Sequence, residues 1–215
     1  EEIIMSKIQE IAEAVTKGKA KIVSGLVQEA LAEGCDPLEI LNEGMIGAMG
    51  VVGEKFRNNE IFVPEMLVAA RAMKKGVETL KPSLKGDDSA TVGKYIIGTV
   101  AGDLHDIGKN LVAMMIESAG FEVIDLGVDV PKEKFVEAVK ANPDCKIVGL
   151  SALLTTTMPA MRDAVAALIE AGCKNQVKIM VGGAPITQEF ADEIGADAYT
   201  ADAASAAQVA KELVA

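Results

Sequence analysis

Apolar and polar residues follow a helical period through the first eighty positions of the chain. Apolar side chains recur at intervals of three and four residues, and Gly18 and Gly34 interrupt the pattern. This spacing places the apolar side chains on one face of an amphipathic helix. We therefore expect two helices before residue 34, with buried series of Ile4, Ile8, Ile11 and Val15, then Ile22, Leu26, Ala30 and Leu31.

Two further helices are expected in the same half. One begins at Asp36, a capping carboxylate, with Pro37 in the first turn and Glu39 three residues after the cap. The other opens at Pro64 and stops at Lys81. Their predicted buried series are Leu38, Leu41, Met45, Met49 and Val52, then Met66, Leu67, Ala70, Met73 and Val77. Four such helices pack as a small bundle.

The helical period ends at a segment rich in turn residues. From Pro82 to Asp88 the regular spacing is lost, which predicts a linker. We therefore expect a four-helix bundle domain at residues 1–88 and a second domain at residues 89–215.

The second half alternates short apolar runs with helical stretches. This alternation is typical of βαβ units around a parallel sheet. Strands are expected at 94–100, 122–126, 147–150, 177–181 and near 198–199, with helices at 108–118, 131–141, 157–171, 187–194 and 203–214. Five of each predict an α/β, flavodoxin-like sheet in the order 2-1-3-4-5. Ligands of such sheets bind where the winding reverses, so loops 101–108 and 151–157 are the candidate site.

Composition narrows the possible partners. Half of the residues are apolar and a quarter are charged, which is the balance of a folded, soluble protein. The net charge of −11 repels phosphate backbones and anionic lipids, so we expect neither a nucleic acid nor a membrane partner. Cys35, Cys145 and Cys173 are far apart and form no paired C-x-x-C spacing, which favours free thiols and a cytoplasmic location.

The loop after the first expected strand contains the only histidine. His105 can bind a metal, and Asp103 stands close enough to accept a proton from its second ring nitrogen. Alternatively, the imidazole only bonds within the loop while Asp103 or Asp106 caps the next helix. A phosphate-binding loop is disfavoured, because five residues separate Gly102 from Gly108 and no hydroxyl residue follows Lys109.

Three separated elements resemble a known signature. They are Asp103-x-His105-x-x-Gly108, Ser151-x-Leu153 and Gly182-Gly183, each at the carboxyl end of an expected strand. Together they are similar to the B12-binding signature of the methionine synthase cobalamin domain and of methyltransferase corrinoid proteins. The resemblance implies that the chain binds cobalamin or a related corrinoid, with its cobalt, in the flavodoxin-like domain.

The resemblance also implies roles for individual residues. His105 is the lower axial ligand of cobalt in place of the cofactor's own base, the base-off/His-on mode. Asp103 accepts from the other ring nitrogen, and the Thr157 hydroxyl lies near that carboxylate. The residues implied to bind the cofactor are Asp103, His105, Asp106, Ile107, Gly108, Ser151, Leu153, Thr155, Thr157, Gly182, Gly183, Ala184, Tyr199 and Ala201.

The first half resembles the helical cap of the same proteins. Phe62, Met66, Leu67 and Ala70 are expected to cover the upper face of the corrin, although periodicity alone fits bundle core equally well. The implied protein is a methyl-carrier subunit with no catalytic residue of its own. Its expected partners are a substrate:corrinoid methyltransferase, a methylcorrinoid:acceptor methyltransferase and a reductive activase. The linker is the expected hinge for moving the cap.

Three other interpretations remain open at this point. A cobalamin subunit of a radical mutase shares the sheet but usually lacks the helical cap. A B12-responsive regulator shares both halves but requires a DNA-binding region. A flavodoxin-like phosphoacceptor using Asp103 or Asp106 leaves the other two motif elements unexplained.

Overall fold

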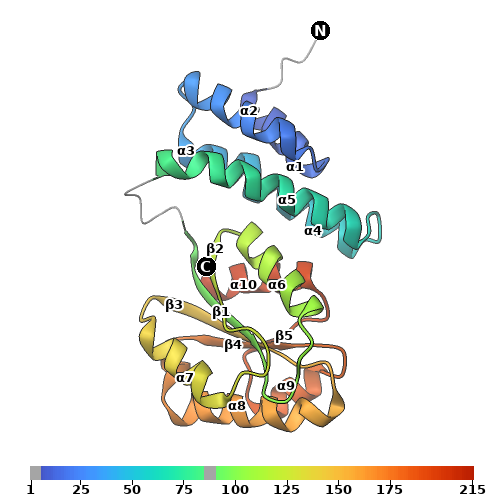
Figure 1. Ribbon diagram of the computed structural model, residues 1–215, viewed down its shortest axis with the longest axis vertical. Helices are drawn as coiled ribbons and strands as arrows, with labels where there is room; N and C mark the ends of the chain where they lie inside the picture. Colours follow the sequence, from blue (N-terminus) through green and yellow to red (C-terminus); the bar gives the residue numbers. More distant parts are fainter. Residues whose placement is uncertain (1–5, 85–90) are drawn as a thin grey trace. The chain divides into compact units, whose positions relative to one another are not determined.

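The structure is a computed structural model that describes residues 6–84 and 91–215 (Figure 1). The chain divides into two compact units. The first comprises Glu1–Thr91 with Ser118–Gly120, and the second comprises Val92–Glu117 with Phe121–Ala215. The predicted boundary at residues 88 and 89 remains a prediction, since the predicted linker lies partly outside the described residues. In the described part, Lys81–Leu84 forms a 3-10 turn, η2.

The first unit is built from helices. Its elements are α1 (Lys7–Thr16), α2 (Ala20–Ala32), α3 (Pro37–Glu39), the π-helical segment η1 (Ile40–Ile46), α4 (Gly47–Arg57) and α5 (Val63–Leu80). Because α3, η1 and α4 are continuous, the unit has four helical rods, as expected from the sequence. Asp36 caps α3 by accepting from the backbone N–H of Leu38 at 3.2 Å. Ile4, in the expected first series, lies outside the described residues.

The expected buried series of α2 is confirmed at Ala30 and wrong at Ile22. Ile22 is 49% exposed and Leu26 is partly buried, whereas their neighbours Val23 and Val27 are fully buried. The reason is the close approach of α2 to α5 at Gly76. A Cβ atom at Gly76 would lie 2.7 Å from Cγ1 of Val23, so Val23 faces the partner helix.

The second unit is a five-stranded parallel sheet in the order β2-β1-β3-β4-β5, which confirms the predicted flavodoxin-like fold. Its strands are β1 (Gly93–Thr99), β2 (Phe121–Asp125), β3 (Cys145–Ser151), β4 (Lys178–Gly182) and β5 (Ala198–Tyr199). Its α-helices are α6 (Ile107–Ser118), α7 (Lys132–Ala141), α8 (Met158–Glu170), α9 (Gln188–Ile194) and α10 (Ala203–Val214). The winding reverses between β1 and β3.

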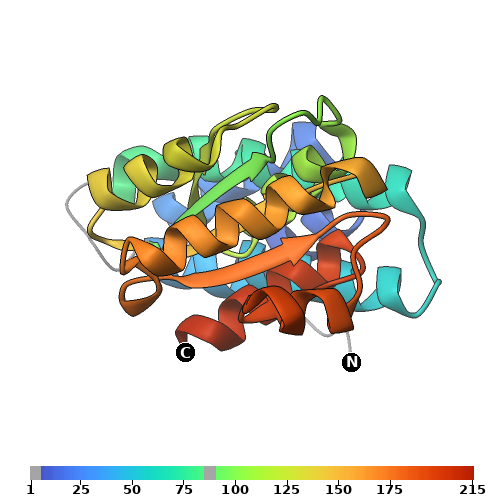
Figure 2. The ribbon, with the colours of Figure 1, turned by 90° about the horizontal axis from the view of Figure 1, so that it is seen from below.

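Helices cover both faces of this sheet. One apolar core joins β1, β3 and β4 to α7, α8 and α9 and includes Phe135, Leu168 and Phe190. Figures 1 and 2 show α7 and α8 side by side on this face, and Figure 1 shows α6 and α10 on the other. Both faces of a parallel sheet are normally covered in this way, which leaves the carboxyl edge of the strands open for loops. Within residues 6–84 and 91–215, no helix is long and apolar enough to cross a membrane.

Candidate cofactor site

The strand register brings three loops together at one edge of the sheet. Thr99 pairs with Ser151 at the ends of β1 and β3, and Ser151 pairs with Gly182 at the end of β4. The chain therefore leaves the sheet at three neighbouring points, and all three motif elements begin there. Their convergence was expected from the sequence alone, because carboxyl ends of parallel strands share an edge.

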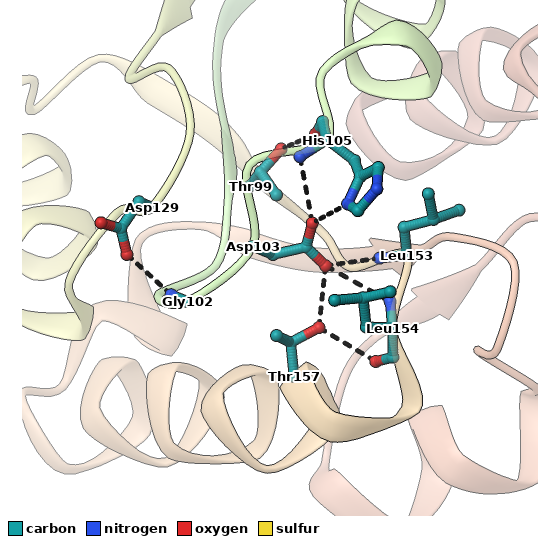
Figure 3. Close-up of polar contacts among 8 residues, drawn as sticks. All are labelled: Thr99, Gly102, Asp103, His105, Asp129, Leu153, Leu154 and Thr157. Atoms are coloured by element: carbon teal, nitrogen blue, oxygen red, sulfur yellow. Dashed lines mark hydrogen bonds and ion pairs between the residues drawn. The ribbon is translucent and has the colours of Figure 1, made fainter.

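A buried carboxylate organises the site (Figure 3). Asp103 is fully buried, and its Oδ1 accepts from Nδ1 of His105 at 2.7 Å and from the backbone N–H of the same residue at 3.1 Å. Its Oδ2 accepts from the Thr157 hydroxyl at 2.8 Å and from the backbone N–H groups of Leu153 at 2.7 Å and Leu154 at 3.3 Å. Donors from both loops therefore hold one side chain, including the hydroxyl contact that the sequence predicted.

These donors also keep the carboxylate ionised. Burial by itself would raise the pKa of Asp103, because a charge is less stable away from water. The backbone N–H of Leu153, the imidazole, the Thr157 hydroxyl and the loop N–H group outweigh burial. They hold the pKa of Asp103 well below the ordinary aspartate value. The side chain is thus a permanent acceptor at neutral pH.

An ionised carboxylate fixes the tautomer of the histidine. Since Asp103 can only accept, Nδ1 of His105 must carry the proton that forms the 2.7 Å contact. The neutral ring then has its lone pair on Nε2, which lies on the side of the ring away from Asp103 (Figure 3). The side chain is 49% exposed, so Nε2 is accessible to a ligand.

Gly182, the last residue of β4, and Gly183 and Ala184, which follow it, lie at the same edge of the sheet. Gly183 has φ +128, and a Cβ atom there would lie 1.8 Å from the carbonyl oxygen of Ala152. A Cβ atom on Gly182 would lie 3.2 Å from the carbonyl oxygen of Thr200. Only glycine therefore fits at residue 183, and Ala184 follows as a small exposed residue.

Exposed apolar side chains lie close to His105 in the sequence and in the loop that contacts Asp103. Leu104 is 72% exposed, Ile107, the first residue of α6, is 78%, Leu153 is 42% and Leu154 is 40%. Leu153 and Leu154 donate their backbone N–H groups to Asp103. Large apolar side chains gathered at the mouth of a site are typical of a surface that binds an apolar ligand.

The other predicted residues lie at or near this edge with varied exposure. Ser151 and Tyr199 are partly buried, and Asp106, Gly108, Thr155 and Ala201 are exposed. Asp106 precedes α6, and its carboxylate accepts from the Asn110 side chain at 3.3 Å. A Cβ atom on Gly108 would meet nothing within 4 Å, so open space adjoins that position.

The four predicted cap residues belong to the helical unit. Phe62 is 65% exposed, Met66 is 1% exposed and Ala70 is 2% exposed, whereas Leu67 is partly buried. Their cover over a cofactor remains a prediction.

The geometry of the loop also argues against phosphate binding, which the sequence disfavoured. Lys109 is buried, and its Nζ donates to Asp125 at 2.5 Å and to Asn110 at 2.7 Å. Its charge is thus engaged at the end of β2 and is not presented to a ligand. Within the described residues, no group of three or more His, Cys, Asp or Glu side chains is arranged to hold a metal ion.

Sequence reasoning missed two residues that hold the His105 loop. The buried Thr99 hydroxyl donates to the His105 carbonyl at 2.9 Å. Asp129, between β2 and α7, accepts from the backbone N–H of Gly102 at 2.7 Å and donates its own N–H to the carbonyl of Asp103 at 2.9 Å (Figure 3). A hydroxyl at a buried strand end and an aspartate in a glycine-containing turn were the available signals.

This fold and site define an α/β protein that binds a ligand at the switch point of its sheet. Comparisons with known proteins identify the ligand. A family model described as a B12 binding domain matches residues 93–210, and a second model with the same description matches residues 7–81.

Whole-length relatives agree with the family match. Dimethylamine corrinoid protein 1 of Methanosarcina acetivorans is 47% identical over 210 residues, covering 97% of each chain. Trimethylamine corrinoid protein of Methanosarcina barkeri is 46% identical over 194 residues, covering 89% of each.

Two solved structures share the fold. One is a cobalamin-binding protein from Desulfitobacterium hafniense, with 33% identity, a TM-score of 0.81 and coverage of 97% of this chain and 98% of that one. The other is a methanol:cobalamin methyltransferase complex from Methanosarcina barkeri, with 32% identity, a TM-score of 0.85 and coverage of 97% and 79%.

The chain therefore belongs to the B12-binding corrinoid proteins, and its cofactor is cobalamin or a related corrinoid. The resemblance to methyltransferase corrinoid proteins stated from the motifs is confirmed. The residues at the edge of the sheet fit this cofactor: an exposed imidazole with its second nitrogen held by a carboxylate, exposed apolar side chains for a macrocycle, and open space beside Gly108.

Proposed function

We propose that the protein carries a methyl group on its corrinoid, which it binds base-off with Nε2 of His105 as the lower axial ligand of cobalt. The observation that carries this proposal is the hydrogen bond between Nδ1 of His105 and the buried Asp103 carboxylate. It leaves one ring nitrogen, with its lone pair, free at a half-exposed position. Metal-bound histidines usually have their second nitrogen bonded to a carboxylate in this way.

The corrinoid supplies the methyl-transfer chemistry when it is bound. The protein's own residues hold and orient it. Asp103 retains the Nδ1 proton and aligns the ring, and Thr157 with two backbone N–H groups holds Asp103. Gly182 and Gly183 let the end of β4 pack closely against the backbone of Thr200 and Ala152, and the cofactor's nucleotide tail is proposed to lie beside this edge, with Ser151 and Thr155 as hydroxyl donors.

The proposed partners are two methyltransferases and an activase. A substrate-specific enzyme delivers the methyl group, a second methyltransferase removes it to an acceptor, and a reductive activase restores the cofactor after oxidation. The relatives named for dimethylamine and trimethylamine support a methylated amine as the donor. Phe62 and Leu67 are proposed to cover the upper face, because they retain exposed surface that Met66 and Ala70 lack.

Reconstitution with hydroxocobalamin tests the binding mode. The wild-type protein is expected to retain the cofactor through desalting and to show an absorption spectrum that changes in His105→Ala. Glu133→Gln is the matched control, because Glu133 is exposed in the first turn of α7 and is not among the predicted cofactor-binding residues. Failure of the wild type to retain cobalamin would refute the carrier role, and identical wild-type and His105→Ala spectra would refute the ligand assignment.

Transfer from a labelled donor tests the carrier role. The reconstituted, reduced protein is incubated with a dimethylamine-, trimethylamine- or methanol-specific methyltransferase and its isotopically labelled substrate. Label is expected on the corrinoid with a methylamine-specific enzyme. Label from methanol alone would contradict the proposed donor class, and no label from any of the three would contradict methyl transfer.

A further inference from the structure

One residue between β2 and α7 has an unusual backbone conformation. Asp129 has φ +52, and Asn59 is the other non-glycine residue with positive φ in the described ranges. This left-handed region costs a non-glycine residue on the order of 1 kcal/mol, although aspartate tolerates it better than most residues. Such a conformation persists where surrounding contacts hold it, and functional sites are enriched in it.

Both polar contacts of Asp129 are with the loop that contains His105. Its Oδ1 accepts from the backbone N–H of Gly102 at 2.7 Å, and its own N–H donates to the carbonyl of Asp103 at 2.9 Å. The left-handed turn directs the side chain toward Gly102 (Figure 3) and the main-chain N–H toward Asp103, two consecutive residues of that loop. The bond from Gly102 is charge-assisted, which makes it stronger than an ordinary backbone bond.

These contacts complete a two-sided hold on Asp103. Leu153, Leu154 and Thr157, in the loop after β3, donate to the Asp103 carboxylate. Asp129, in the loop after β2, donates to the Asp103 backbone carbonyl. Thr99 holds the carbonyl of His105 at 2.9 Å, so the end of this loop has its own contact. Asp129 adds contacts at Gly102 and Asp103, in the part of the loop that precedes the ligand.

We propose that Asp129 is a positioning residue that holds loop 101–105 so that His105 keeps Nδ1 on Asp103 and directs Nε2 outward. Asp129 itself touches neither metal nor cofactor in this arrangement and acts through the loop. The inference rests on the proposed function, because its consequence for cobalt depends on His105 being the ligand.

Three substitutions separate the hydrogen bond from the backbone conformation. Asp129→Asn retains an acceptor oxygen and tolerates positive φ. Asp129→Gly removes the acceptor but suits φ +52, so it relieves strain and is expected to fold. Asp129→Ala loses the acceptor and retains the strain. Glu133→Gln, at an exposed position in the first turn of α7, is the control for loss of a nearby negative charge.

The cofactor-free protein provides the first measurement. Because the chain has a single histidine, nitrogen-15 NMR of the imidazole reports on His105 alone. Well above the ordinary imidazole pKa of about 6.5, the Nδ1-protonated tautomer is expected to dominate in wild type, Asp129→Asn and Glu133→Gln. In Asp129→Gly the Nε2-protonated tautomer, which free imidazole side chains favour, is expected to rise to a comparable population.

The cobalamin-loaded protein provides the second measurement. After nitrogen-15 labelling of the single histidine and reduction to Co(II), the fraction of histidine-ligated cofactor is read from the doublet nitrogen splitting of the electron paramagnetic resonance spectrum. Loss of a charge-assisted hydrogen bond predicts a fall of about tenfold in the ratio of ligated to unligated cofactor in Asp129→Gly and little change in Asp129→Asn. A role in stability alone would lower the unfolding temperature of Asp129→Gly and leave both the tautomer and this ratio unchanged.

The outcomes distinguish the inference from the proposed function. If Asp129→Gly has the wild-type tautomer in the cofactor-free protein, the positioning role is refuted. If the wild type has the Nδ1-protonated tautomer and Asp129→Gly loses it, the positioning role stands. Absence of nitrogen-15 splitting in the labelled wild-type Co(II) protein would overturn the ligand assignment of His105 and leave the positioning role intact.

Discussion

Replacing Asp103 with alanine should destabilise the sheet unit, because its carboxylate accepts hydrogen bonds from both loops. The residue is fully buried, and its removal leaves the backbone N–H groups of Leu153, Leu154 and His105 without their acceptor. The Thr157 hydroxyl retains the carbonyl of Leu154, at 2.9 Å. An unsatisfied buried donor costs about 1–3 kcal/mol, and these three contacts are partly buried, so the lower end of that range predicts a loss of about 3 kcal/mol in the free energy of unfolding.

Tyrosine fluorescence during urea unfolding measures this loss of stability in the sheet unit, which contains Asp103. The chain has no tryptophan, and both tyrosines, Tyr95 and Tyr199, lie in the sheet unit. With a denaturant slope of about 2 kcal/mol per molar urea, the midpoint of the cofactor-free Asp103→Ala variant should fall by about 1.5 M. Asp106→Ala, an exposed carboxylate in the same loop, should shift the free energy by no more than about 0.5 kcal/mol.

The pH dependence of the difference in unfolding free energy between wild type and Asp103→Ala provides a second test. The pKa of Asp103 is lowered in the folded protein, so its stabilisation is complete above its unfolded pKa of about 3.9. It is lost as the pH falls through the lower folded value. The difference between wild type and Asp103→Ala should therefore be constant from neutral to mildly acidic pH and shrink below about pH 4. Equal midpoints for Asp103→Ala and Asp106→Ala, or a difference that grows in acid, would refute the reasoning.

Three further substitutions test the surroundings of the site. Gly183→Ala should lower the free energy of unfolding by at least about 2 kcal/mol in urea titrations and weaken cobalamin retention, because the new Cβ would lie 1.8 Å from the Ala152 carbonyl oxygen; wild-type behaviour would contradict this. Asp125→Ala should lower the free energy of unfolding by about 3 kcal/mol, because it leaves the buried Lys109 charge unpaired. Adding Lys109→Met should recover stability in a double-mutant cycle, and additive losses would contradict this. Thr157→Val should cost about 1 kcal/mol and Thr157→Ser almost nothing, as measured by urea unfolding; a larger loss for serine would contradict a hydroxyl role.

Much of the fold was readable from local patterns, because parallel strands and amphipathic helices differ in period. The sheet order and the convergence of the three motif elements followed from that alternation. The buried face of α2 did not, because the choice between Ile22 and Val23 depends on the close approach of α5 at Gly76. A helical wheel contains no information on the partner helix.

The candidate site shows the same division between local and distant information. Asp103 and His105 stand two residues apart, so their contact could be predicted, and the resemblance supplied Thr157. Asp129 could not be predicted, because 27 residues separate it from Gly102 and only the folded loops bring them together. The left-handed backbone that aims it is also not encoded by residue type, since aspartate adopts that region only occasionally.

The most direct test of the account is the Co(II) electron paramagnetic resonance spectrum of the cobalamin-loaded protein after selective nitrogen-15 labelling of histidine. The chain has one histidine, so only His105 is labelled, while the cofactor's own base retains nitrogen-14. If His105 is the axial ligand, the nitrogen splitting changes from a triplet to a doublet on labelling. A triplet that persists in the labelled protein would show that the cofactor's base still occupies the axial position and would contradict the central claim.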